Sequence, residues 1–307
     1  MEMTFQVNSV HAPCQPLSRS QIESRLSSCT CLPSLGSIES ALKEMLGADQ
    51  RYTSQIAEII RRDPSLTARL LRLVNAVHYG LSKRVKTIEE AVFYLGTAQI
   101  RQLAMVTPII EDFQIMASHT RLEWRGFWRH CIGTALMTRE VIDLVRSQNA
   151  ETDYVAGLIH DVGKIAMASA FPEHFAEIYI HRTEADKELL ELEREVLGMD
   201  HAELGAIYLQ RQTLPEDYVE IVRFHHQPEQ APTHGLMAAA VQVADLLVQE
   251  AKIGYSGRLP LAGQELWVKT TGWKMLFAHQ TAEENALSRA SLKNSLKFIP
   301  STLERLI

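Results

Sequence analysis

The feature that most constrains the fold is the spacing of the apolar residues. From Leu35 onward it follows a helical period of about 3.6, with the stretch 254–273 as the one ambiguous region. No segment combines sustained period-2 alternation with β-branched enrichment between hairpin turns, so we expect little or no sheet. The chain is therefore predicted to be all-α. One buried helical face begins after the N-cap residue Ser65 and consists of Leu66, Leu70, Leu73, Val74 and Val77.

Capping patterns and polar stretches predict how the helices are grouped. Thr87–Glu90, Asp200–Glu203 and Thr281–Glu284 have the spacing of capping boxes. The polar stretch 111–123 is the best boundary between two helical lobes, and it lacks the Gly, Ser or Pro content of a flexible linker, so we expect the lobes to pack together. The predicted parts are a loosely ordered arm over 1–32, an N-terminal helical lobe over 33–112, a second helical lobe over 120–252, and an extension, mostly loop then helix, over 253–307.

Composition limits the classes of partner. The 307 residues are 46% hydrophobic and 22% charged, with a formal net charge of −6, which argues against broad binding to nucleic acid. The apolar run Gly235–Val248 is interrupted by Gln242 and Asp245, and the first residues lack the apolar core of a signal peptide. Cys29 and Cys31 lack the two-residue spacer of a zinc knuckle. We expect a cytoplasmic protein with reduced thiols and no membrane partner.

The 12 histidines are scattered, but a subset has neighbours suited to metal binding. Imidazole and carboxylate ligands together suit one or two divalent ions such as Fe, Mn, Zn or Mg, and two ions that share a carboxylate can hold a hydroxide for attack on phosphorus. Asp245 is the most telling residue, because a carboxylate among apolar neighbours is costly unless it is paired or metal-bound. The candidate ligands are His130, His160, Asp161, His201, His225, His226 and Asp245.

Lys164 follows His160 by four residues. Both residues fall in a helix predicted from residue 154 to about residue 168, so this spacing places their side chains on the same face, and the ammonium could meet an anionic oxygen beside the ligand. Other histidines on amphipathic helices are more simply explained by packing or by surface exposure: His78, His119, His174, His181, His234 and His279.

The ordered set His130, His160–Asp161 and Asp245 resembles the H…HD…D signature of the HD superfamily of metal-dependent phosphohydrolases. His201 and His225–His226 resemble the additional histidines found where that fold holds two metals. Over residues 32–252 the chain looks like the HDOD family of that superfamily. The matching segments are Asp63–Leu66 with Leu70–Asn75, Thr87–Ala91 with Leu95–Gly96, Gly157–Lys164, His201–Ala206 with Leu214–Pro215, and His225–Pro228.

This resemblance implies an all-helical bacterial signalling protein whose second lobe is an HD-type helical core. Most HDOD proteins have lost part of the metal set and have no established catalytic activity, whereas this chain has a ligand-type residue at every matched position. It also departs from the cyclic di-GMP phosphodiesterases of the HD-GYP group, because Gln227–Glu229 replaces the DGxGYP motif after His226 and Gly126 stands where some members carry a further glutamate.

Two functions remain open. The first is a regulator that acts mainly by binding a protein partner, or a nucleotide or other phosphate ligand, with its metal site as the control element. Its N-terminal lobe would then face the partner, since residues 35–106 carry many basic side chains and no catalytic cluster. The second is a metal-dependent phosphohydrolase that acts on a nucleotide or other phosphate ester, with Asp161 and Lys164 as its catalytic residues.

Overall fold

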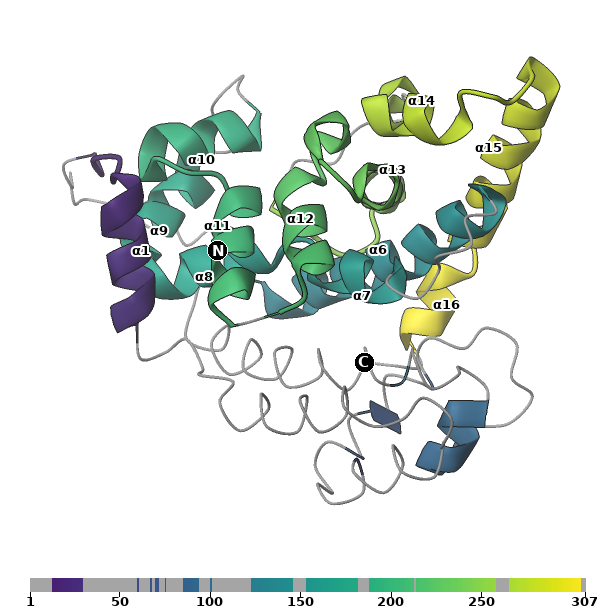
Figure 1. Ribbon diagram of the computed structural model, residues 1–307, viewed down its shortest axis with the longest axis horizontal. Helices are drawn as coiled ribbons and strands as arrows, with labels where there is room; N and C mark the ends of the chain where they lie inside the picture. The colour runs from purple at the N-terminus through teal and green to yellow at the C-terminus, as the bar shows by residue number, and fades with distance from the viewer. Residues whose placement is uncertain are drawn as a thin grey trace, which may run out of the picture.

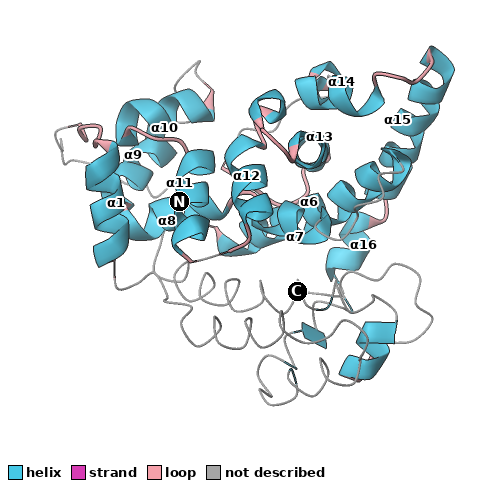
Figure 2. Ribbon diagram, viewed as in Figure 1, coloured by secondary structure: helices cyan, strands magenta, loops and turns pink. Residues whose placement is uncertain are grey.

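The structure is a computed structural model. It describes residues 13–29, 85–93, 123–145, 153–181, 188–212, 214–257 and 265–304, together with the single residues Ile60, Thr67, Leu70, Leu71, Asn75 and Ile100. Figure 2 shows helices joined by short loops, with no strand in the described part of the chain. The all-α prediction is confirmed. Most of the predicted N-terminal lobe lies outside the described residues, and with it His78, His119 and most of the basic residues, so its lobe boundary and partner-facing role stay predictions.

Figure 1 labels most of the helices whose bounds the described part of the chain gives. They are α1 (Arg19–Ser28), α6 (Trp124–Val145), α7 (Asp153–Ile159), α8 (Val162–Ala170), α9 (Pro172–His181), α10 (Leu189–Leu197), α11 (His201–Arg211), α12 (Glu216–Phe224), α13 (Gly235–Glu250), α14 (Thr271–Phe277), α15 (Ala282–Leu296) and α16 (Ile299–Glu304), with short 3-10 turns η1 (Pro228–Gln230) and η2 (Leu266–Lys269). None of these helices is long and apolar enough to span a bilayer.

Helix α13 lies at the centre of the second half of the molecule. It packs against α6 on one side and α14 on another, with α12 and η1 also in contact. Its own side chains are small or branched apolar residues on almost every side, and four consecutive ones, Ala238–Val241, are fully buried. A helix that is apolar all round is expected to be buried, so the sequence of α13 explains its central place.

Helices α8 and α11 meet backbone to backbone. The contact is made by glycines: an added Cβ at Gly163 would lie 2.7 Å from the backbone nitrogen of Gly205, and one at Gly205 would lie 3.0 Å from that of Gly163. Since real Cβ atoms essentially never come under 3.0 Å of another heavy atom, a side chain at Gly163 would push the helices apart. The pair of glycines therefore lets the start of α11 lie directly beside the start of α8.

The segment predicted as a loosely ordered arm contains a helix. Ser18 and Gln21 form a complete capping box at the start of α1, and Ile22 and Leu26 are buried. The backbone nitrogen of Leu17 also donates to the carbonyl of Leu197, 2.8 Å away, which ties the segment to the end of α10. The expectation of loose order is wrong for residues 19–28, and the signal that would have corrected it is the Ser18–Gln21 spacing.

The C-terminal extension packs back on the centre of the molecule. The stretch 254–273, predicted as loop, includes η2 and the start of α14. The capping box at Thr281 and Glu284 is confirmed at the start of α15. Both α15 and α16 contact α6, and Figure 1 shows them at the end of the molecule opposite to α1.

Candidate metal centre

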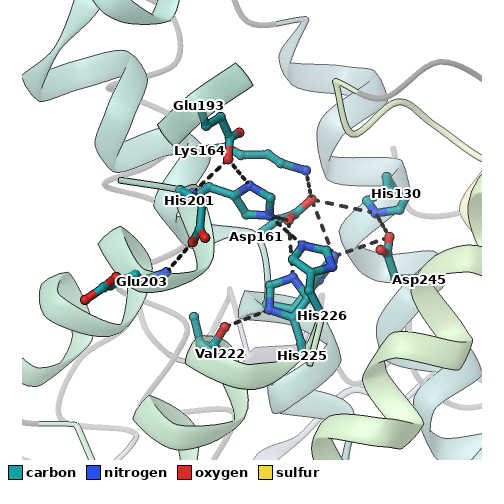
Figure 3. A network of polar contacts seen from close by, with 12 residues as sticks. His130, Asp161, Lys164, Glu193, His201, Glu203, Val222, His225, His226 and Asp245 are labelled. Atoms are coloured by element: carbon teal, nitrogen blue, oxygen red, sulfur yellow. Dashed lines mark hydrogen bonds and ion pairs between the residues drawn. The ribbon is translucent and has the colours of Figure 1, made fainter. Parts of the chain in front are cut away.

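The candidate ligands come from five places in the fold and point toward one another, as Figure 3 shows for most of them. His130 lies on α6, His160 and Asp161 form the turn between α7 and α8, His201 opens α11, His225 and His226 follow α12, and Asp245 lies on α13. Their ligand atoms form two groups, and within each group all of these atoms lie within 4.8 Å of one another. The first group is His130, His160 and Asp245, and the second group is Asp161, His201, His225 and His226.

The first group is arranged around the carboxylate of Asp245. Its Oδ1 lies 3.0 Å from Nε2 of His130 and 3.7 Å from Nε2 of His160. The side-chain amide of Gln249, one turn further along α13, donates to the same oxygen at 2.6 Å. The amide therefore fixes the orientation of the carboxylate that faces the two imidazoles.

The second group is arranged around Oδ1 of Asp161, which lies 3.1 Å from Nε2 of His201 and 3.9 Å from Nε2 of His225. Nε2 of His226 lies 3.0 Å from Nε2 of His201. The other oxygen of Asp161, Oδ2, faces the first group, 3.4 Å from Nε2 of His160 and 3.9 Å from Nε2 of His130. One carboxylate thus offers one oxygen to each group, the geometry that a bridging ligand needs.

The helix that carries His160 and Asp161 does not continue as predicted. The sequence predicts one helix from residue 154 to about residue 168, but the structure has a turn at these two residues between α7 and α8. The prediction that His160 and Lys164 share a helical face is therefore wrong. Lys164 instead donates to Oδ2 of Asp161 at 2.6 Å, so its ammonium neutralises the carboxylate that lies between the two groups.

The second nitrogen of several histidines is held by a hydrogen bond on the outer side of the ring. Nδ1 of His160 bonds the carbonyl of Gly157 at 2.8 Å, and Nδ1 of His225 bonds that of Val222 at 2.7 Å. A carbonyl only accepts, so Nδ1 carries the proton, and in the neutral ring Nε2 has a free lone pair that faces inward. The buried Nε2 atoms of His130, His160 and His225 make no well-formed hydrogen bond, although that of His130 lies 3.0 Å from Oδ1 of Asp245. Since buried polar atoms are rarely left unpaired, this arrangement fits a divalent metal.

Electrostatics in the centre follow from burial and from the mixture of charges. Burial opposes ionisation of Asp161, but Lys164 and the imidazoles of His160 and His201 hold its pKa well below the usual range. Burial likewise opposes the charge of His160, but the carboxylates of Asp161 and Asp245 outweigh it and raise the pKa of this imidazole to about 9. Burial, with His160 and His201 nearby, lowers the pKa of His225 to about 3. Burial also opposes ionisation of Asp245, but the imidazoles of His130 and His160 hold its pKa well below the usual range. Both carboxylates therefore stay ionised, as metal ligands must be.

Solvent reaches very little of the centre. Six of the seven candidate ligands are at most 2% exposed, and Lys164 is 5% exposed, whereas His226 is partly exposed. Among the seven candidate ligands, His226 is the one that solvent reaches appreciably.

Two residues of the centre were not predicted from the sequence. Gln249 follows Asp245 by four residues, so helical spacing could have identified it. Glu193 is buried and accepts hydrogen bonds from both Nδ1 and the backbone nitrogen of His201. No spacing rule predicts this contact, because α10 and α11 are brought together by the intervening turn. His174 lies outside the centre, as predicted, and contacts the carbonyl of Gln15.

Known proteins resemble this chain in sequence and in fold. The sequence profile of the HDOD domain matches residues 32–228. An uncharacterized protein of Treponema pallidum (strain Nichols) is 30% identical over 180 residues, which cover 58% of this chain and 34% of that protein. The chain therefore spans about a third of the length of this relative.

Three solved structures share the fold. An HDOD domain protein of unknown function from Geobacter sulfurreducens superposes with a TM-score of 0.78 at 23% identity, over 94% of this chain and 99% of that one. A protein of Shewanella amazonensis SB2B, provisionally named a metal-dependent phosphohydrolase, superposes with a TM-score of 0.56 at 19% identity, over 90% of this chain and 97% of that one. A protein of Marinobacter aquaeolei VT8, provisionally named a signal transduction protein, superposes with a TM-score of 0.63 at 16% identity, over 93% of this chain and 65% of that one.

The profile match covers well over half of the chain, and the residues that it includes supply six of the seven side chains of the centre. The chain belongs to the HDOD family.

Proposed function

We propose that this chain is a bacterial, cytoplasmic signalling regulator that acts by binding a protein partner or a phosphate ligand, with the metal centre as its control element. The observation that carries the proposal is the burial of a complete ligand set. Turnover of a phosphate ester requires the ester to reach the reacting atoms, whereas six of the seven ligand-type side chains are at most 2% exposed. A buried centre of this kind is better suited to stabilising one arrangement of the surrounding helices.

The ligand set explains why metal would change the protein. A bound divalent ion supplies positive charge between the two carboxylates and the inward-facing imidazoles. The ligands belong to α6, α11, α13, the turn between α7 and α8 and the turn after α12, so their positions relative to one another depend on how these elements pack. Because a ligand shifts a conformational equilibrium only through differential affinity, metal favours the packing in which all of these side chains converge.

A second function, metal-dependent phosphohydrolase, is favoured by one observation. Asp161 directs one oxygen toward each group, as a carboxylate that bridges two ions does, and Lys164 lies beside it. In this alternative Asp161 holds both ions and the ammonium of Lys164 contacts an anionic oxygen of a nucleotide or other phosphate ester. The bond between Lys164 and Asp161 argues against it, since the ammonium is already paired.

One experiment separates the two functions. The full chain is loaded with Mn²⁺ or Fe²⁺ and incubated with a panel of nucleotides and simple phosphate esters, and phosphate release is compared with that of Asp161→Ala, shown to be folded by circular dichroism. We expect equal, background release from both proteins, together with metal-dependent changes in hydrogen exchange of the parent alone. Metal-dependent turnover near the usual enzyme range of about 1 per second or more, absent from Asp161→Ala, would establish the phosphohydrolase.

A further inference from the structure

His201 differs from the other ligand-type histidines in what holds its outer nitrogen. His160 and His225 are held by the backbone carbonyls of Gly157 and Val222. His201 donates from Nδ1 to Oε2 of Glu193 at 2.7 Å, so a carboxylate stands behind its ring. Figure 3 shows Glu193 on the side of His201 away from Asp161. Glu193 and His201 are both buried, at 2% and 0% exposure, so solvent does little to weaken this bond.

The contact depends on the turn between α10 and α11. Helix α10 ends at Leu197 and is capped by Gly198, whose φ of +95° lies in the left-handed region that glycine adopts at little cost. The chain then reverses through Met199 and Asp200, and Asp200 caps α11 by accepting from the backbone nitrogen of Glu203 at 2.9 Å. This reversal returns the chain so that the first residue of α11 lies beside Glu193.

We infer that Glu193 is a positioning residue that raises the metal affinity of the second group by acting through His201. A carboxylate on Nδ1–H fixes the tautomer, fixes the ring plane and makes Nε2 a stronger donor to a metal. That Nε2 lies 3.1 Å from Oδ1 of Asp161, within the second group. The inference rests on the proposed metal binding and adds that the two groups are supported unequally, since Asp245 of the first group is held by the neutral amide of Gln249.

A purely structural role for Glu193 is the alternative. The same oxygen accepts from the backbone nitrogen of His201 at 2.9 Å, and an acceptor for a free nitrogen at a helix start stabilises the helix by itself. Glu193→Gln separates the two roles, because the amide oxygen of glutamine can accept both hydrogen bonds while the negative charge is lost. Asp200→Asn is the matched control, since it removes a carboxylate from the same end of α11 and leaves the partner of His201 unchanged.

The test is a titration of the metal-stripped full chain with Co²⁺, followed by visible absorption, for the parent, Glu193→Gln and Asp200→Asn. We expect two binding steps in the parent. Glu193→Gln should lower the Co²⁺ affinity of one step by about tenfold or more, and Asp200→Asn should keep the affinities of both steps within about twofold of the parent. If the parent binds no Co²⁺, the proposed function itself fails. If the parent binds and Glu193→Gln matches it, or weakens both steps equally, only the positioning role is overturned.

A second measurement covers the case in which Glu193→Gln does not fold. The parent is loaded with Zn²⁺, which is diamagnetic, and the ring nitrogens of His201 are identified in a long-range ¹H–¹⁵N spectrum. We expect a protonated Nδ1 and a metal-bound Nε2. A metal-bound Nδ1, or a ring without metal at either nitrogen, overturns the assignment of Glu193.

Discussion

Gly163→Ala tests whether the backbone contact between α8 and α11 builds the centre. The new methyl would lie 2.7 Å from the backbone nitrogen of Gly205 and 2.8 Å from the carbonyl carbon of His201, and nearer still to the carbonyl oxygen of His201. All three atoms belong to backbone, so they cannot move without moving α11 itself.

The expected cost follows from these distances. Non-bonded carbon contacts lie near 3.5 Å, and the contact with the carbonyl oxygen of His201 is far shorter than this, so the helices must separate by more than about 1 Å. Overpacking of this kind costs typically about 1 to 3 kcal/mol of the free energy of unfolding, and we expect the upper end because no flexible side chain can yield. The same displacement lengthens the 3.1 Å contact between Asp161 and His201. The second group should therefore lose metal affinity, while His130, His160 and Asp245, which lie on neither helix, should retain theirs.

The assay is urea unfolding followed by far-ultraviolet circular dichroism, combined with the Co²⁺ titration. Gly126→Ala is the matched control in a helix, because there the closest atoms belong to the flexible end of Glu123 and the nearest other atom is Cβ of Tyr255 at 3.1 Å. We expect this control to stay within about 1 kcal/mol of the parent. A Gly163→Ala protein as stable as the parent, with both metal steps intact, would refute the close-contact explanation.

Three further outcomes are expected. Burial raises the pKa of Asp153 to about 6, above the value near 3.9 of an unfolded chain, so the folded state binds this proton more tightly. The contribution of Asp153 to the free energy of unfolding should therefore fall by about 3 kcal/mol as pH rises from about 4 to about 7. Asp153→Asn should flatten this fall, and equal pH slopes in urea unfolding would contradict the assignment. The chain should not hydrolyse cyclic di-GMP, because Gln227–Pro228 and the η1 turn follow His226 in place of a glycine-rich motif; prompt hydrolysis at catalytic enzyme levels would overturn this. Acidification should release metal, since the imidazoles must be neutral to bind it. Dialysis at stepped pH, followed by measurement of the metal content, tests this, and metal that stays bound at about pH 4 would count against histidine ligation.

The sequence predicted the helices best where local signals and packing agree. The sequence predicts a helix over about residues 236–251, and α13 is observed over Gly235–Glu250, because an apolar run interrupted only at Gln242 and Asp245 both forms the helix and buries it. The capping box at Thr281 located the start of α15 for a local reason, since its two hydrogen bonds join residues three apart.

Features that depend on tertiary contacts escaped prediction. The turn at His160–Asp161 is hidden because apolar residues continue at helical spacing on both sides of it. The turn reorients Asp161 toward both groups, which no local pattern encodes. Glu193 reaches His201 only through the reversal at Gly198, and the contact of Gly163 with α11 requires knowing which helices cross. Chemistry identified the candidate ligands, whereas the residues that orient them required the fold.

The most direct test of the metal centre is the metal content of the native full chain, purified without chelator and measured by inductively coupled plasma mass spectrometry. We expect about one to two equivalents of Fe, Mn, Zn or Mg per chain, reduced in a folded Asp161→Ala variant, because Asp161 offers an oxygen to both groups. Less than about a tenth of an equivalent of any of these metals, in protein never exposed to chelator and with no uptake on reconstitution, would contradict metal binding by the seven side chains.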